Sequence, residues 1–139
     1  MKTRYTSLVS VKKNIMQKSE GTFKSANEIL NNALSALKIS FNALNDIETP
    51  LRGRMPEFLA SRMLLDAQRE LITHNEEWVE FAKRETESAK EQLKFDTIEY
   101  EKFNYLELQE IKEQIKRSKF LEAKELDEIA LMTYGNKKR

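Results

Sequence analysis

The chain of 139 residues has no cysteine, only two prolines and three glycines, and almost no excess of charge of either sign. The absence of cysteine excludes disulfides, thiolate metal sites and thiol nucleophiles. The scarcity of proline and glycine argues against sandwiches, barrels and doubly wound sheets, which use both residues at their turns. The net charge of +1 argues against general nucleic-acid binding, because that activity requires a basic surplus.

Long apolar runs are also missing. No run approaches the roughly 18 residues that would cross a bilayer, and the basic start of the chain, residues 1–5, is not followed by the apolar stretch of a signal peptide. Charged residues make up 34% of the chain, which exceeds the share of about 25% in an average soluble domain. We therefore expect one soluble, cytoplasmic domain over residues 1–139 that is nearly all helical.

The helix breakers fall in one place. Pro50, Gly53 and Pro56 lie within residues 50–56, and proline removes a helix hydrogen bond and clashes with the preceding turn. This predicts one break over residues 49–56, between a first helix over about residues 5–48 and a second over about residues 57–133.

Two further glycines concern the helices themselves. Gly135, with Asn136, suits a C-terminal cap, which would leave a basic tail over residues 134–139. Gly21 lies inside the first helix, where glycine costs about 1 kcal/mol relative to alanine and could mark a bend. We interpret it as a weak point of one helix and not as a boundary.

Apolar residues recur every seven positions, which is the period of a coiled-coil seam. Before the break, the first column is Val9, Met16, Phe23, Leu30, Leu37 and Leu44. The second column is uneven and reads Lys12 or Lys13, Ser19 or Glu20, Ala26, Ala33 or Leu34, Phe41 and Ile47. After the break, two adjacent columns follow: Leu64, Leu71 and Trp78, and Phe58, Leu65, Ile72 and Val79, with Ser61, Gln68 and Asn75 between them.

Two amphipathic helices joined by a short break should fold back as an antiparallel coiled-coil hairpin. Pairing outward from the break places Tyr5 near residue 100, so that roughly the last thirty residues of the longer second helix overhang without a partner. An exposed apolar stripe on such an overhang marks an interaction surface. Its expected members are Leu108, Ile111, Ile115, Phe120, Leu121, Leu126, Ile129 and Met132.

Catalytic chemistry is not indicated by the sequence. His74, the only histidine, shares a helix column with Ala60, Ala67 and Phe81 and is expected at the edge of the seam. Carboxylate clusters interleaved with Lys and Arg are typical of a solvated helix face. There is no glycine-rich phosphate loop. We expect a protein that is not an enzyme and that holds no metal or cofactor.

The charge is unevenly distributed along the chain. Residues 1–24 carry six basic groups against Glu20 alone. One interpretation is a frayed, solvated helix start. The other is a basic tip that docks with an acidic partner, since clusters of Lys and Arg steer association. Membrane-surface binding is a poorer third, because the region lacks a wide apolar face with aromatic residues.

Three features carry a family resemblance. The first is the length, with two long helices and one central break. The second is residues 4–9, Arg-Tyr-Thr-Ser-Leu-Val, leading to Lys12 and Lys13. The third is residues 122–130, Glu-Ala-Lys-Glu-Leu-Asp-Glu-Ile-Ala, which look like an acidic-Leu-Asp-Glu-apolar-Ala signature before a basic tail. Together they resemble the FliJ family, soluble components of the flagellar type III export apparatus.

The resemblance implies a non-catalytic stalk, similar to the central γ subunit of rotary ATPases. Its terminal ends would enter the pore of the hexameric export ATPase, and its loop side would reach the export gate protein FlhA. The implied ATPase contacts are Leu126, Asp127, Glu128 and Ile129, with Arg4, Lys12 and Lys13. The implied gate contacts are Phe58, which lines up with an apolar family position after the break, and its neighbours Phe41, Leu44 and Leu65.

The same resemblance implies a place at the cytoplasmic face of the flagellar basal body, reaching the membrane only through partners, with export chaperones as further partners. Two other functions fit the residue pattern. One is an escort that holds export substrates or their chaperones on the apolar stripe. The other is a structural coiled coil that self-associates through the overhang. The stalks of virulence type III systems and of rotary ATPases are alternatives within the first class.

Overall fold

A computed structural model describes residues 2–137 of the chain, with side chains described through Gly135. It consists of two long α-helices: α1 spans Thr6–Asp46 and α2 spans Met55–Lys137. No strand occurs in this described part. The predicted all-α class is therefore confirmed, with a second helix of 83 residues that is about twice as long as the first, of 41 residues. No helix within the same residues combines the length and the apolar character that a membrane crossing needs.

Two threonine hydroxyls accept backbone hydrogen bonds at the start of α1. The backbone N–H of Tyr5 donates to Thr3 Oγ1 at 3.1 Å, and the N–H of Thr3 donates to Thr6 Oγ1 at 2.8 Å. Thr3 thus caps the N–H two positions later, and Thr6 returns a side-chain acceptor to Thr3, which is a variant of the capping box. The helix therefore begins within a residue of its predicted start.

The ends of α2 differ slightly from the prediction. The helix begins at Met55, so Pro56 lies in the first turn, where its missing N–H costs no helix hydrogen bond. Glu57 adds a carboxylate near the positive end of the helix dipole. The predicted cap at Gly135 is not formed, because α2 continues through it to Lys137 without a left-handed glycine. The end of the predicted tail, residues 138–139, lies outside the described residues.

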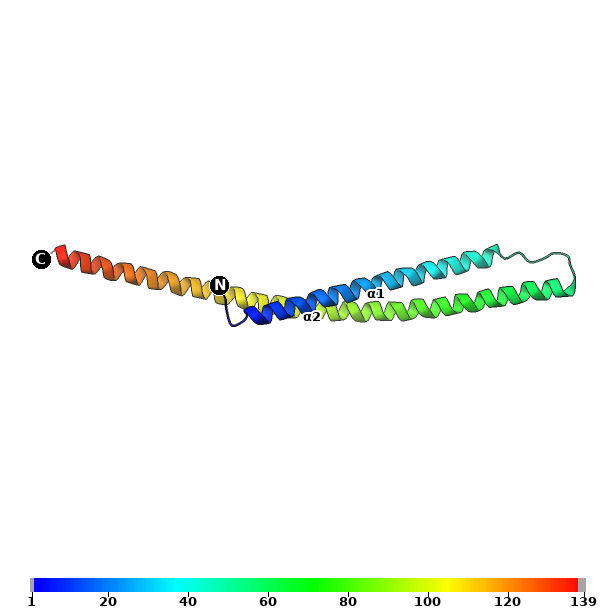
Figure 1. The fold of residues 1–139 in the computed structure, drawn as a ribbon, viewed down its shortest axis with the longest axis horizontal. Helices are drawn as coiled ribbons and strands as arrows, with labels where there is room; N and C mark the ends of the chain where they lie inside the picture. Colours follow the sequence, from blue (N-terminus) through cyan, green and yellow to red (C-terminus); the bar gives the residue numbers. More distant parts are fainter. Residues whose placement is uncertain (1, 138–139) are drawn as a thin grey trace. The chain divides into compact units, whose positions relative to one another are not determined.

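Contacts divide the chain into two compact units, and both helices contribute to each. The hairpin unit is residues 17–95, and the terminal unit combines the first 16 residues with the chain from Asp96 onward. In the hairpin unit, α1 and α2 run side by side in opposite directions (Figure 1). In the terminal unit, Lys12 pairs with Glu99 while Arg4 pairs with Glu110, so the direction is antiparallel there as well. The predicted antiparallel hairpin is confirmed.

The seam of the hairpin unit follows one seven-residue repeat on each helix. On α1 the less exposed positions include Ser19, Phe23, Ala26, Leu30, Ala33, Leu37, Ser40 and Leu44, and Ile47 continues the pattern just after the helix ends. On α2 they include Ser61, Leu65, Gln68, Ile72, Asn75, Val79, Ala82, Thr86, Ala89 and Leu93. The predicted place of Phe41 in this seam is wrong: Ser40 occupies it with 3% exposure, and Phe41 is 45% exposed. Two successive steps of four residues, from Ala33 through Leu37 to Phe41, would lead off the face that meets α2.

The best-buried cluster is built from small side chains. Ala33 is fully buried, Ala82 is 2% exposed and Val79 is 4% exposed, and Leu30 and Leu37 pack against them. Alanine on both helices lets the two backbones approach closely, because it has no side chain beyond Cβ to separate them. The core is thus a thin line between two helices, which is all that a two-helix hairpin can bury.

Asn75 and Gln68 of α2 interrupt the seam with polar side chains, and both have partners on α1. Asn75 Nδ2 donates to Ser40 Oγ and to Ala36 O, the latter at 3.4 Å. Gln68 Nε2 donates to Ser40 O at 2.9 Å. A buried polar group costs stability unless it is hydrogen-bonded. A shifted register would break these bonds, so the polar layers specify which residues of α1 and α2 face each other.

The register differs from the one predicted by counting outward from the break. Tyr5 lies near residue 108 and not near residue 100, because Thr6 contacts Glu107 and Arg4 contacts Glu110. The reason is the connector between the helices. Residues 47–54 are not helical, and extended chain covers about 3.3 Å per residue against about 1.5 Å in a helix. The connector therefore runs along the first turns of α2, where Ser61 Oγ donates to Glu48 O at 3.5 Å.

Candidate interaction surfaces

The basic start of α1 finds acidic partners on α2 of the terminal unit. Arg4 Nε donates to Glu110 Oε2 at 3.1 Å, and Lys12 Nζ lies 3.6 Å from Glu99 Oε2. Lys12 Nζ also lies 5.7 Å from the centre of the Phe103 ring, within the range of a cation–π contact. The sequence left open whether the basic start is frayed or docks with an acidic partner. In the structure, Glu99 and Glu110 of the same chain act as acidic partners of this basic start.

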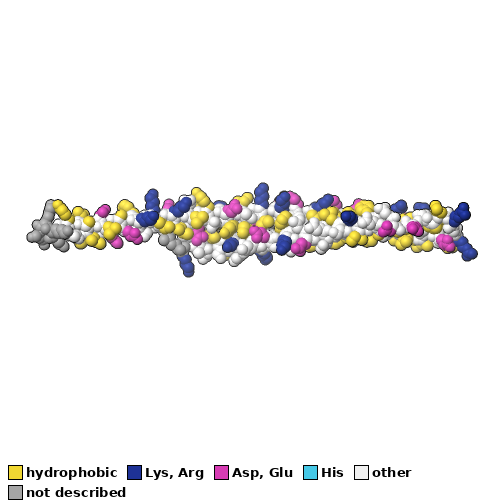
Figure 2. Space-filling model, turned by 90° about the horizontal axis from the view of Figure 1, so that it is seen from above, with side chains coloured by type: hydrophobic (Ala, Val, Ile, Leu, Met, Phe, Trp, Pro, Cys, Tyr) yellow, Lys and Arg dark blue, Asp and Glu magenta, His cyan; other side chains and the backbone are white. Residues whose placement is uncertain are grey.

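Beyond these contacts, α2 continues as a single exposed helix. Every residue from Ile115 through Gly135 is exposed, and we call residues 115–135 the extension. Hydrophobic side chains lie at its surface, as the left part of the view in Figure 2 shows. Their exposed fractions are Ile115 39%, Phe120 70%, Leu121 56%, Leu126 66%, Ile129 59%, Leu131 71%, Met132 68% and Tyr134 60%. The predicted overhang is therefore present, but its apolar side chains do not form one stripe. At 3.6 residues per turn, Ile115, Leu126 and Ile129 share one side of the helix, whereas Phe120 and Leu131, and Leu121 and Met132, lie on others.

The residues that the family resemblance implied as ATPase contacts fall into two groups within the terminal unit. Residues 126–129 lie on the extension, where Leu126 is 66% and Ile129 is 59% exposed. Arg4 and Lys12 lie against residues 99–110 of α2, and Lys13 is exposed on α1. Sixteen residues of helix separate position 110 from position 126, about 24 Å at 1.5 Å per residue. The fold does not bring the two groups together in this single chain.

The residues implied as gate contacts lie in the half of the hairpin unit nearest the connector, but they differ in exposure. Leu44 and Leu65 are partly buried in the seam between α1 and α2. Phe41 is 45% exposed and Phe58 is 36% exposed. A partner protein could therefore touch the two phenylalanines without opening the hairpin, whereas the two leucines are largely committed to the contact between the helices.

An apolar stripe on α2 of the hairpin unit has no counterpart in the predicted site residues. Leu64 is 56%, Leu71 46% and Trp78 38% exposed. We call these three, with Phe81 at 54%, the outer stripe. The sequence showed this column beside that of Leu65, but only one of two adjacent columns can face the single partner helix. Gln68 and Asn75 pair with α1, so the seam consists of their column and that of Leu65. The position of these polar residues is the signal that could have identified the Leu64 column as the outer one.

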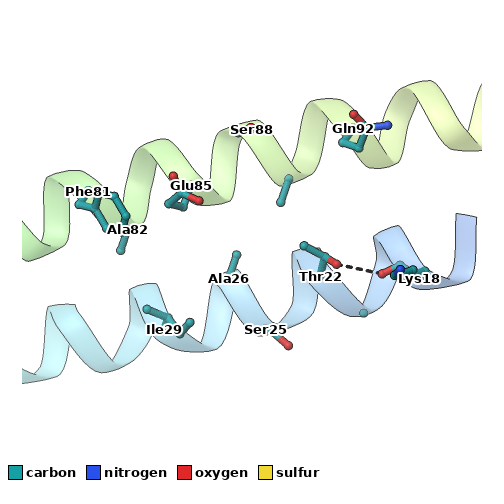
Figure 3. Close-up of a pocket in the computed structure, with 12 residues that line it drawn as sticks. Lys18, Thr22, Ser25, Ala26, Ile29, Phe81, Ala82, Glu85, Ser88 and Gln92 are labelled. Atoms are coloured by element: carbon teal, nitrogen blue, oxygen red, sulfur yellow. Dashed lines mark hydrogen bonds between the residues drawn. The ribbon is translucent and has the colours of Figure 1, made fainter. Parts of the chain in front are cut away.

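A shallow groove lies on one side of the hairpin unit, between α1 and α2 (Figure 3). It is lined largely by small residues, among them Gly21, Ser25, Ala26, Ala82, Ser88 and Ala89. Ala26 and Ala82 each point toward the facing helix, and Thr22 Oγ1 donates to Lys18 O at 3.1 Å within α1. Thr86 Oγ1 donates to Ala26 O across the seam at 3.2 Å. The small residues leave an open depression and no enclosed cavity.

Neither this groove nor the rest of the described chain assembles a cluster that could hold a metal ion. The sequence predicted His74 at the edge of the seam. In the structure it is exposed on α2, outside the seam. No group of three or more His, Asp or Glu side chains that could hold a metal ion occurs among the described residues. What the described surface offers a partner is apolar and charged helix faces.

A family model described as Flagellar FliJ protein matches residues 1–139, the whole chain. No curated protein and no solved structure gives a significant match.

Proposed function

Since the chain belongs to the FliJ family, a non-catalytic component of the flagellar export apparatus, we propose that it is the stalk of the export ATPase. In this role its terminal unit inserts into the hexameric export ATPase, and its hairpin unit contacts the export gate protein FlhA. Such a stalk acts at the cytoplasmic face of the flagellar basal body, and export chaperones are further partners.

The observation that carries the proposal is the extension. A monomeric protein rarely leaves so many large apolar side chains exposed along one helix unless another molecule covers them. Leu126 and Ile129 are more than half exposed on a helix with no partner in the described chain. A helix of this kind can enter a pore lined by other subunits, where its apolar side chains would be buried on all sides.

The proposed gate contact rests on the exposed residues near the connector. Phe41 and Phe58 are available at the surface, and aromatic side chains are frequent anchors of protein interfaces. Leu44 and Leu65 support this contact indirectly, because they hold the two helices together beneath it.

The test is a titration of the purified cognate export ATPase with the intact chain. We expect turnover to rise and hexamer assembly to increase. A Leu126→Ser/Ile129→Ser variant should require at least a tenfold higher concentration, because burying each such side chain contributes roughly 1.5–3 kcal/mol. An Ile39→Ser/Met63→Ser variant is the matched control, since both residues are 66–71% exposed in the hairpin unit. Unchanged turnover and assembly with the intact chain would contradict the proposal.

An escort function is the second candidate, and the exposed outer stripe is the observation that favours it. An escort would bind unfolded or helical export substrates in stoichiometric amounts without stimulating an ATPase. Trp78→Ser/Phe81→Ser should then abolish binding of the substrate. A self-associating coiled coil would instead sediment as a multiple of 16.4 kDa in the absence of any partner.

A further inference from the structure

The N-terminal segment, residues 2–16, is attached to α2 through contacts near the protein surface. The Arg4 side chain is 73% exposed in its pair with Glu110, whose side chain is 26% exposed. The pair of Lys12 with Glu99 is 27% and 23% exposed. None of the described residues of the segment is buried. An exposed ion pair such as that of Arg4 contributes little to stability. Because the segment also buries no side chain fully, it is weakly held.

The rest of α1 is attached differently. In the hairpin unit, Ala33 is fully buried against Val79 and Ala82, and Ser40 is bonded to Asn75. Proteins open locally where few apolar groups are buried and most contacts face solvent. The N-terminal segment is therefore the part of α1 that detaches from α2 most readily.

Detachment of the segment uncovers a distinctive surface on α2. The acidic face consists of Glu99, Phe103, Glu107 and Glu110. Steps of three and four residues place these side chains on one side of the helix. Glu107 Oε1 accepts a hydrogen bond from Thr6 Oγ1 at 3.0 Å, and the Phe103 ring has Lys12 Nζ at 5.7 Å and Lys102 Nζ at 5.3 Å. The face thus combines carboxylates with an aromatic ring that attracts cations.

The segment itself indicates what this face recognises. It is the start of a helix with two basic side chains, Arg4 just before α1 and Lys12 within it, and the partly buried Val9 lies between them. A helix from another protein with the same arrangement would meet the same carboxylates and the same ring. Charge complementarity therefore selects a basic amphipathic helix as the occupant.

We propose that the N-terminal segment is a placeholder on the acidic face, and that a basic amphipathic helix of a partner protein displaces it. Displacement exchanges one helix for another on α2 and releases Arg4 and Lys12 for contacts elsewhere. The inference goes beyond the stalk function and does not depend on it, because it rests on the contacts within the terminal unit alone.

A placeholder lowers the affinity of any competing helix in proportion to the fraction of molecules in which the face is free. The test therefore uses the full chain with Arg4→Gln/Lys12→Gln, which weakens the segment and leaves the acidic face intact. The probe is a fluorescent synthetic peptide with the natural sequence of residues 2–16, followed by anisotropy at low salt. We expect the peptide to bind this variant at least about tenfold more tightly than it binds the intact chain.

Further variants show whether the peptide occupies the proposed face. Adding Glu99→Gln/Glu110→Gln to the weakened chain should abolish binding. Adding Glu87→Gln/Glu101→Gln, which removes the same charge at exposed positions, should leave it unchanged. A scrambled peptide of the same composition should bind much more weakly than the natural one. Circular dichroism confirms that each variant retains its helices.

The proposal is overturned if the weakened chain and the intact chain bind the peptide equally, or if neither binds it. It is also overturned if the scrambled peptide binds as well as the natural one, because the face would then attract any polycation. These binding measurements are made without the ATPase. A negative result would therefore contradict the placeholder proposal and leave the stalk function untouched.

Discussion

The contact between Ser40 and Asn75 is the most specific bond in the seam, and a double-mutant cycle measures what it contributes. Asn75 is 8% exposed and Ser40 3% exposed, so neither side chain can replace the lost partner with much water. Ser40 Oγ also donates to Ala36 O at 2.8 Å within α1. Each residue thus keeps one partner, Ala36 O, when the other is removed, which makes the cycle interpretable.

The expected size follows from these partners. Asn75→Ala removes the bonds to Ser40 Oγ and Ala36 O, each with a net contribution of about 1 kcal/mol. We therefore expect this variant to lose about 1–3 kcal/mol of the free energy of unfolding. Ser40→Ala should lose about 1 kcal/mol, and the double variant should lose about 1 kcal/mol less than the sum of the two single losses.

The assay is unfolding by guanidinium, followed by the fluorescence of Trp78. This is the only tryptophan of the chain, and it lies one helical turn from Asn75 in the hairpin unit. Thr73→Ala is the matched control, since its hydroxyl is exposed and donates only within α2, to Arg69 O at 3.1 Å. If the losses of Ser40→Ala and Asn75→Ala simply add, the two side chains do not act as a pair and the reasoning is refuted.

Two further predictions concern α1. Raising the salt concentration to about 1 M, where the screening length falls to about 3 Å, should lower the hydrogen-exchange protection of amides 9–16 and leave amides 27–44 unchanged; equal loss in both would show that the ion pairs with α2 do not hold the N-terminal segment. Gly21→Ala should raise the free energy of unfolding by about 1 kcal/mol, because a Cβ there meets nothing within 4 Å; a lower midpoint of thermal unfolding would mean that the helix requires glycine for a bend.

The sequence was sufficient to predict the two helices, their one break and their antiparallel pairing. Pro50, Gly53 and Pro56 marked the break, because proline and glycine act on the backbone locally. The column from Phe23 to Leu44 marked the seam, because a seven-residue period has only one physical cause over such a length. These features depend on residues near each other in the chain.

The features that were not predicted depend on which residues of α1 and α2 face each other. The extended connector shifts the pairing, so Tyr5 lies farther along α2 than counting predicts. Ser40, and not Phe41, lies in the seam, because hydrogen bonds from Asn75 and Gln68 compensate for the cost of burying a polar residue there. Hydrophobicity alone favours Phe41 over Ser40 as the buried residue of the seam. Ser40 is buried instead because the facing helix supplies its hydrogen-bond partners.

The same limitation applies to the candidate surfaces. The extension was predicted, since a longer second helix must leave residues without a partner. The acidic partners of Arg4 and Lys12 were not, because their carboxylates lie about one hundred residues away in the sequence. The outer stripe was visible as a column, and only the polar positions Gln68 and Asn75 beside it could have assigned it to the surface.

Site-specific photo-crosslinking in native cells tests the stalk function most directly. A photoreactive benzoylphenylalanine in place of Ile129 lies on the exposed extension, and one in place of Ile39 serves as the control, because Ile39 is 66% exposed in the hairpin unit. We expect the chain labelled at position 129 to form an adduct with the export ATPase, and the chain labelled at position 39 to form none. An ATPase adduct from position 39 and none from position 129 would contradict the proposed insertion of the terminal unit.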